Sequence, residues 1–193
     1  MAGKQAKILT RQQIRAALRW ARRARYPERD RIMILLSVKA GLRAGEIAKL
    51  QWPMVLDADG RVGNRIELHD NAAKKRSGRT IPLHPELRRA LLRLCWQTGA
   101  IGAVIQSERG DSRGMRPSSI VNWFRHLYRE LGLNRCSSHS GRCTFITNAA
   151  RLVFQAGGSL RDVQQLAGHR SIEQTQAYID GSARAKRRLI SLL

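Results

Sequence analysis

Residues 166–178 read LAGHRSIEQTQAY and place a histidine and a tyrosine at a fixed interval just before a basic C-terminus. The pattern predicts a short helix over residues 171–178, which Ser171 can cap. Thr175 and Tyr178 are three residues apart and therefore share one face of this helix. An imidazole can transfer a proton and a phenol can act as a nucleophile, so the segment holds two parts of a catalytic site.

Two upstream segments add arginines and a second histidine. Residues 40–47 read AGLRAGEI and residues 138–145 read SHSGRCTF. Arg43 opens a predicted helix, and His139 and Arg142 stand at the N-terminus of another, where the helix dipole favours an anion. Guanidinium groups bind phosphate oxygens in pairs, so the two arginines indicate a phosphate site.

Each of these residues also has an ordinary structural interpretation. A single arginine in an arginine-rich chain is most often solvated, and Arg43 with Glu46 three residues on can be a surface ion pair. His169 can neighbour a helix N-cap, and Tyr178 can be a half-buried phenol. The three segments therefore indicate a site only when they are taken together.

The charge of the chain indicates a polyanionic partner. Lys and Arg number 36 against 14 Asp and Glu, a formal net charge of +22, and most of the basic residues are arginine. Guanidinium favours phosphate, so nucleic acid is the expected partner. No apolar run is long enough to span a bilayer and the N-terminus lacks the apolar stretch of a signal peptide. These features predict a cytoplasmic protein without a membrane partner.

The cysteines do not form a metal-binding pattern. Cys95, Cys136 and Cys143 lack CxxC spacing and the even count of a disulfide scaffold. We therefore expect reduced thiols and no metal site.

The periodicity predicts a mainly helical chain with one small antiparallel sheet. Thr10 and Gln13 form a capping box that opens the first helix. Helices are expected over residues 10–25, 29–40, 44–50, 85–97, 117–131, 141–155, 159–167, 171–178 and 183–192. Short runs of β type are expected to form the sheet at residues 54–56, 65–69 and 79–83.

The length suits one domain. Residues 1–9 are expected to be a basic flexible leader, residues 10–180 the domain itself, and residues 181–193 a C-terminal helix. The end of that helix is amphipathic and can pack on its own core or on a neighbouring copy of the chain. Both arrangements bury the same leucines, so the sequence leaves them open.

Taken together, the three segments resemble the three boxes of the tyrosine recombinase (phage integrase) family. The family patterns are A-G-L-R-x-x-E-[IL], H-x-[LG]-R-x-[ST]-F and a third of the type L-A-G-H-R-S-I-x-x-T-x-x-Y. The match covers about residues 10–178. It departs at Cys143, where many relatives carry His, Arg or Lys, and at Ile179-Asp180, where some relatives carry a His or an aromatic residue. Most members also have an N-terminal DNA-clamping domain, so the chain is similar either to a fragment of such an enzyme or to the compact fimbrial phase-variation invertases.

The resemblance implies a DNA breaking and rejoining enzyme that works without a metal or other cofactor. Tyr178 would attack the phosphodiester and form a 3′-phosphotyrosyl intermediate. Arg43 and Arg142 would stabilise the charge on the phosphoryl oxygens and favour the phenolate of the tyrosine. His139 and His169 would assist proton transfer and phosphate binding.

The family's hairpin pattern, K-x-x-x-x-R-x-[VI]-P-L, indicates further residues. Its register selects Lys74 as the general acid that protonates the departing 5′ oxygen, with Lys75 as the alternative if the hairpin slips by one residue. Glu46 is expected to support the site. The basic residues expected to bind DNA are Lys75, Arg76, Arg79 and Arg170.

The family also implies an assembly. Its members carry out site-specific recombination through a Holliday junction, as four protomers on two double-stranded DNA duplexes. An accessory DNA-bending protein is a further expected partner.

Three other interpretations stay open. A type IB topoisomerase uses the same chemistry to relax DNA. A non-catalytic basic DNA-binding or excision-directing protein needs only the positive charge. The third alternative is a structural nucleoid protein, although such a protein would not need the phenol in the third box.

Overall fold

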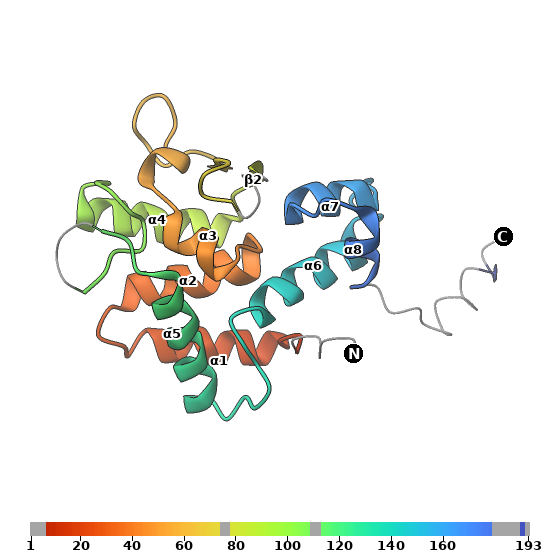
Figure 1. Cartoon of the computed structure of the whole chain (residues 1–193), viewed down its shortest axis with the longest axis horizontal. Helices are drawn as coiled ribbons and strands as arrows, with labels where there is room; N and C mark the ends of the chain where they lie inside the picture. The colour runs from red at the N-terminus through yellow and green to blue at the C-terminus, as the bar shows by residue number, and fades with distance from the viewer. Residues whose placement is uncertain (1–6, 74–77, 109–112, 179–189, 192–193) are drawn as a thin grey trace.

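The computed structural model describes residues 7–73, 78–108, 113–178 and 190–191. Lys74, Lys75 and Arg76 lie outside these residues, as does almost all of the expected C-terminal helix. Figure 1 shows two groups of helices. Residues 7–130 form a larger body with a small sheet at one edge, and residues 140–178 form a smaller group beside it.

The helices of the body are α1 (Arg11–Ala21), α2 (Pro27–Lys39), α3 (Ala44–Lys49), α4 (Pro85–Thr98) and α5 (Pro117–Glu130). Helix α1 begins with the expected capping box, in which Thr10 and Gln13 each accept a hydrogen bond from the backbone N–H of the other. It ends at Ala21 rather than near Arg25. Turns connect Ala21 to Pro27, and a proline disfavours helical backbone at the residue before it.

Helix α2 is the centre of the body. Residues 32–38 are all buried, as their apolar sequence predicts. A helix that is apolar on all sides needs neighbours on all sides, and α1, α4 and α6 (Ser140–Leu152) pack against it. The resulting core includes Trp52 and Phe124, both fully buried.

The sheet consists, within the described residues, of β1 (Arg65–Leu68) and β2 (Arg79–Pro82). The strands are antiparallel, with Ile66 opposite Ile81. Both isoleucines are buried and join the core of the body. The prediction of a small antiparallel sheet is therefore confirmed.

The prediction of a further strand at residues 54–56 is wrong. Trp52–Met54 forms a short 3-10 turn, η1, because Pro53 suits the first turn of a helix and lacks the N–H that a strand would use. Leu56 makes only an isolated bridge with Val62. Three apolar residues carry too little periodicity to separate a strand from a buried turn.

The smaller group contains α6, α7 (Leu160–Ala167) and α8 (Ile172–Gln176) around a separate apolar cluster. The buried members of this cluster are Ile146, Ala150, Val153, Val163 and Ala167. Ser159 and Asp162 form a capping box at the start of α7. Helix α8 ends at Gln176, before the expected end, so Tyr178 lies just beyond it, with its N–H donating to the carbonyl of Thr175.

The N-terminal segment and α6 connect the two groups. Leu9 is buried, and its N–H donates to Oγ1 of Thr144 on α6 at 2.8 Å. Helix α6 lies so close to α2 that a Cβ at Gly141 would overlap the side chain of Ser37. Residue 9, which was expected to belong to the flexible leader, is therefore part of the packed structure.

Candidate active site

A buried carboxylate holds the first segment in place. Arg43 is the N-cap of α3, and Glu46 accepts hydrogen bonds from its backbone N–H at 2.9 Å and from its Nη1 at 2.7 Å. The side chain of Glu46 is only 1% exposed, and that of Arg43 is 23% exposed. The interpretation of this pair as a surface ion pair is therefore wrong.

Arg79 on β2 binds the same carboxylate. Its Nη1 and Nη2 donate to the two oxygens of Glu46 at 3.1 and 3.0 Å, and its Nε donates to the carbonyl of Leu166 in α7 at 2.9 Å. Burial by itself would raise the pKa of Glu46. The hydrogen bonds and charges of Arg79, and then of Arg43, outweigh burial and lower that pKa below its ordinary value. Glu46 is therefore ionised at neutral pH.

Arg142 on α6 connects the smaller group to the body. It is 3% exposed, its Nη1 donates to the carbonyl of Gly41 at 2.6 Å, and its Nη2 donates to the carbonyl of Ala167 at 2.7 Å. Burial, followed by the charge of Arg43, lowers the pKa of Arg142 to about 10. The guanidinium therefore stays charged at neutral pH while its position is set by two backbone carbonyls.

His169 and Tyr178 lie side by side in the third segment. Their rings stack with centroids 5.7 Å apart and an interplanar angle of 22°. Nδ1 of His169 is hydrogen-bonded to Oγ1 of Thr175 at 3.0 Å, and Thr175 is buried. Thr175 and Tyr178 therefore both contact the imidazole of His169, although Tyr178 lies just beyond the end of α8.

Burial and positive charge keep the imidazole neutral. Burial, followed by the charges of Arg142, Arg43 and Arg79, lowers the pKa of His169 from 6.5 to about 4. Burial also raises the pKa of Tyr178 by more than Arg142 and Arg43 lower it. The two arginines therefore favour the phenolate, as expected, but burial and Cys143 outweigh their charges, so the phenol stays protonated at neutral pH.

Cys143, the departure from the family's second box, lies against the tyrosine. Its thiol is buried and hydrogen-bonded to the side chain of Tyr178. Burial raises the pKa of the thiol, and the contact adds to the rise in the pKa of Tyr178. Cys143 therefore favours the protonated phenol.

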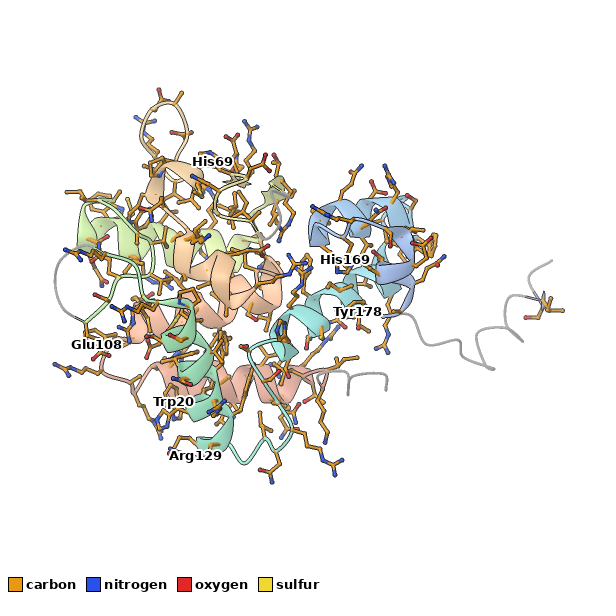
Figure 2. The ribbon with its side chains drawn as sticks, viewed as in Figure 1. Trp20, His69, Glu108, Arg129, His169 and Tyr178 are labelled. Carbon is orange, nitrogen blue, oxygen red and sulfur yellow. The ribbon has the colours of Figure 1, made fainter. Side chains whose placement is uncertain are left out.

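Several of the side chains described above border one open cleft of about 540 Å³. Its lining residues are Arg43, His139, Arg142, His169, Gln174, Ala177 and Tyr178. His139 is the exposed N-cap of α6, and Figure 2 shows His169 and Tyr178 within the smaller group. The cleft therefore brings together the candidates from all three segments.

The remaining predicted residues do not line this cleft as far as the structure describes them. Outside the described residues lie Lys74, Lys75 and Arg76. Arg170 is exposed and borders a neighbouring cleft together with Arg79 and Arg161. The role of Arg79 and Arg170 in DNA binding stays a prediction, although the side chain of Arg79 is only 6% exposed.

Two glutamines of the site were missed by the sequence analysis. Gln164 is buried in α7; its side chain donates to the carbonyl of His169, and its own carbonyl accepts from the His169 N–H, both at 3.1 Å. Gln174 lines the cleft from α8. No local pattern distinguishes Gln164 from an ordinary helical residue. The place of Gln174 within the third segment is a signal that could have found it.

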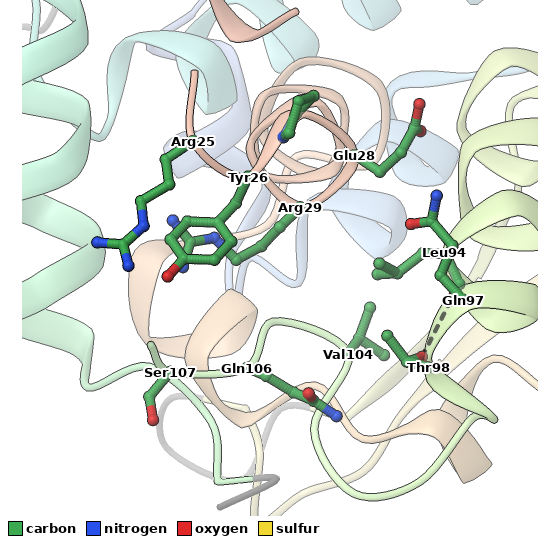
Figure 3. Close-up of a pocket in the computed structure, with 11 residues that line it drawn as sticks. Arg25, Tyr26, Glu28, Arg29, Leu94, Gln97, Thr98, Val104, Gln106 and Ser107 are labelled. Carbon is green, nitrogen blue, oxygen red and sulfur yellow. Dashed lines mark hydrogen bonds between the residues drawn. The ribbon is translucent and has the colours of Figure 1, made fainter. Parts of the chain in front are cut away.

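A separate pocket lies in the body. Figure 3 shows this pocket of about 500 Å³, which Tyr26, Leu94 and Val104 help to line. The guanidinium carbons of Arg25 and Arg29 lie 5.3 and 4.2 Å from the centre of the Tyr26 ring. The pocket shares no lining residue with the cleft at Tyr178, so it is a separate feature.

Metal-ligating side chains do not gather in the described part of the chain. Among those residues no group of three His, Cys, Asp or Glu side chains is placed to hold an ion. Over the same residues, no helix has both the length and the apolar character needed to cross a bilayer.

The fold and the cleft together define a class of protein. Solved tyrosine recombinases share this mainly helical fold with a small sheet, and in this chain two arginines, two histidines and a tyrosine border one cleft. The chain belongs to the phage integrase family, which matches residues 7–184. The resemblance seen in the three segments is thereby confirmed.

Curated relatives are longer than this chain. Tyrosine recombinase XerC of Rhodospirillum centenum is 30% identical over 166 residues, which cover 80% of this chain and 43% of the relative. Tyrosine recombinase XerA of Pyrococcus furiosus is 26% identical over 154 residues, which cover 78% of this chain and 49% of the relative. The chain thus spans less than half the length of these two relatives.

Solved structures share the fold. The integrase of transposon Tn1549, in complex with a circular intermediate DNA, has a TM-score of 0.77 at 18% identity, over 100% of this chain and 67% of that chain. The crystal structure of XerA recombinase has a TM-score of 0.74 at 20% identity, over 98% of this chain and 65% of that chain. At this level of identity the likeness supports the fold alone.

Proposed function

We propose that this chain is the catalytic part of a site-specific DNA recombinase that breaks and rejoins DNA through Tyr178. The observation that carries the proposal is the cleft in which Tyr178 meets Arg43, Arg142, His139 and His169. Membership of the phage integrase family supports the same reaction. The net charge of +22 fits a substrate rich in phosphate.

In the first step the phenolic oxygen of Tyr178 attacks the phosphorus of a DNA phosphodiester. A bond forms between that oxygen and the 3′ phosphate, the bond to the 5′ oxygen breaks, and the departing oxygen takes up a proton. In the second step a 5′ hydroxyl attacks the phosphotyrosine, which rejoins a strand and releases the tyrosine. The intermediate retains the phosphoester bond, so the reaction needs no high-energy cofactor.

Arg43 and Arg142 stabilise the negative charge that develops on the phosphoryl oxygens. Arg142 uses two of its N–H groups on backbone carbonyls, which fixes the guanidinium and leaves further N–H groups for a phosphate. Arg43 is bound by Glu46 but is partly exposed, so the rest of its guanidinium can meet substrate. Donors held in this way need no rearrangement when the charge develops.

The phenol must lose its proton as it attacks. His169 is a neutral imidazole stacked on Tyr178, and Thr175 occupies its Nδ1, so Nε2 is the nitrogen that we assign to the substrate. His139 borders the same cleft from the start of α6. We assign both histidines to proton transfer and phosphate binding, and Lys74 to protonation of the 5′ oxygen.

The proposal extends to assembly. Four chains would act on two duplexes and exchange strands in turn through a Holliday junction, with residues 181–193 packing on the same chain or on a neighbour. An accessory DNA-bending protein would help to bring the duplexes together. The net charge of this chain supports close packing on DNA.

The covalent adduct tests the proposal. The substrate is a pool of DNA duplexes that are nicked beside a randomised region. Cleavage next to the nick releases a short fragment, so the strand cannot be rejoined and the covalent adduct is trapped. The adduct is then detected on a denaturing gel, and the sequence of the cleaved duplex is recovered from the pool. The full chain is expected to form adduct, and Tyr178→Phe none. DNA binding should be unchanged, because the substitution removes one oxygen and no positive charge.

Tyr26→Phe is the matched control, since Tyr26 lines the separate pocket in the body, and it should form adduct normally. Adduct in Tyr178→Phe, or its absence in the unchanged chain, contradicts the proposal. A type IB topoisomerase would instead relax a supercoiled plasmid that lacks the sequence cleaved in the random pool.

A further inference from the structure

Arg79 has a buried side chain next to the cleft, and the proposed chemistry gives this arginine no role. Its side chain is 6% exposed. Nη1 and Nη2 donate to the two oxygens of Glu46, and Nε donates to the carbonyl of Leu166. A guanidinium presents these donors in one rigid plane, so the three bonds set its orientation relative to both α3 and α7.

The loop that carries His169 packs onto the same guanidinium. A Cβ at Gly168 would lie 2.9 Å from Nη1 of Arg79 and 3.2 Å from its Cζ. Gly168 has a φ of +62°, a conformation that favours glycine, and its missing side chain leaves room for the arginine. Arg79 thus contacts the residue directly before His169 as well as the carboxylate that holds Arg43.

The end of α7 receives two arginines. Arg79 donates to the carbonyl of Leu166, and Arg142 donates to the carbonyl of Ala167. The last carbonyls of a helix lack partners within the helix and carry partial negative charge. The two carbonyls are consecutive; Arg79 reaches the first from β2 and Arg142 reaches the second from α6. The two guanidiniums therefore tie the end of α7 to the body and to the rest of the smaller group.

We infer that Arg79 is a positioning residue, which holds the Glu46–Arg43 pair in register with the end of α7 and hence with His169. The inference rests on the proposed function of the cleft. It differs from the DNA-binding role that the hairpin pattern indicated, because Nε, Nη1 and Nη2 of Arg79 all donate to protein atoms. A shift of about 1 Å in a catalytic group can lower a rate by about a hundredfold, so loss of Arg79 can stop the reaction without unfolding the chain.

Arg79→Lys is the test, because it keeps the charge but cannot bridge both oxygens of Glu46 and the carbonyl of Leu166 at once. The nicked duplex recovered from the random pool is the probe. We expect the single-turnover rate of adduct formation at saturating duplex to fall by about ten- to a hundredfold. The Kd for the duplex and its salt dependence should stay within about twofold of the unchanged chain.

Arg88→Lys is the matched control. Arg88 also donates through Nε and Nη2 to two backbone carbonyls, those of Gly63 and Val62, at 2.9 and 3.0 Å. It does not line the cleft. The control should therefore keep the unchanged rate of adduct formation.

Three results would overturn the inference. A weaker Kd with a shallower salt dependence and an unchanged saturated rate would make Arg79 a DNA contact. An unchanged rate and Kd would show that Arg79 does not position the cleft. An equal loss of rate in Arg88→Lys would indicate a general effect of replacing arginines that donate to backbone carbonyls.

A second variant covers the case in which Arg79→Lys does not fold by circular dichroism. Glu46→Gln keeps the shape of the side chain and weakens its hold on both Arg79 and Arg43. It should lower the saturated rate with an unchanged Kd, and an unchanged rate would overturn the inference. Failure of the proposed function would look different, because the unchanged chain would then form no adduct.

Discussion

The body and the smaller group are stabilised in different ways. The body surrounds α2 with a large apolar core that includes Trp52 and Phe124. The smaller group has a short apolar cluster of its own. Much of what joins it to the body is polar: Arg142 binds the carbonyl of Gly41, and Arg79 binds the carbonyl of Leu166. We call this junction the seam; it consists of Gly41, Glu46, Arg79, Arg142 and the end of α7.

The proposed chemistry lies at the seam. The guanidinium of Arg142 binds backbone carbonyls of both groups and also borders the cleft. Its charge is therefore in position before any substrate arrives, which is the condition for electrostatic stabilisation of a transition state. Substitutions in the core of the body should change stability alone, whereas substitutions at the seam should change stability and catalysis together.

The largest expected effect comes from Arg142→Ala compared with Arg43→Ala. Both should slow adduct formation by about a hundredfold or more, because each removes a charge donor. Only Arg142→Ala should also lower the free energy of unfolding substantially, by about 2–4 kcal/mol, since it leaves two buried carbonyls without donors. Single-turnover cleavage and urea denaturation measure the two effects. Equal stability in the two variants would mean that the carbonyl contacts do not hold the seam.

Gly41→Ala sharpens the comparison through packing alone. Gly41 has a φ of +65°, and a Cβ there would overlap the ring of Phe145 on α6. We expect a loss of about 2–4 kcal/mol in the free energy of unfolding, from backbone strain and the overlap together. Gly60→Ala is the control, because Gly60 has a φ of +72° but open space around it. It should lose only about 1 kcal/mol, and a similar loss in both variants would show that contact across the seam is loose.

The smallest expected effect is a dependence on pH. The pKa of His169 is about 4 in the folded chain, against 6.5 ordinarily. Above pH 6.5 the imidazole is neutral in both states. Between pH 6.5 and 4 the unfolded chain takes up the proton first, so the folded state loses stability as pH falls, and below pH 4 that loss is complete. Glu46 adds a loss at lower pH, when its carboxylate with its lowered pKa is protonated.

Melting temperatures at pH 7 and pH 5 measure this dependence. The melting temperature should fall between pH 7 and pH 5, and in His169→Gln this fall should be smaller than in the unchanged chain by about 2–4 °C. That difference corresponds to about 1 kcal/mol in a chain of this size. His84 in the body also has a pKa lowered by burial and then by Lys39, so His84→Gln is the comparison. If His84→Gln reduced the drop as much, the acid sensitivity would not be a property of the seam.

Short-range patterns in the sequence determined the elements of the fold. The capping box of Thr10 and Gln13, the apolar run at residues 32–38 and the pairing of Ile66 with Ile81 all depend on neighbours along the chain or on one hairpin. The spacing within the three segments is local in the same way, which is why it also predicted the side chains that border the cleft. It was wrong at residues 54–56, where the pattern is too short to define an element.

Only the tertiary structure decided what each arginine does. Glu46 and Arg79 are 33 positions apart, Arg79 and Leu166 are 87 apart, and Arg142 and Gly41 are 101 apart. A local pattern does not separate a buried arginine from a solvated one, because burial depends on segments that meet only when the chain folds. The sequence thus predicted five of the side chains that border the cleft, those of Arg43, His139, Arg142, His169 and Tyr178. The packing of the smaller group against the body decided which of their charges are held by protein atoms and which border the cleft.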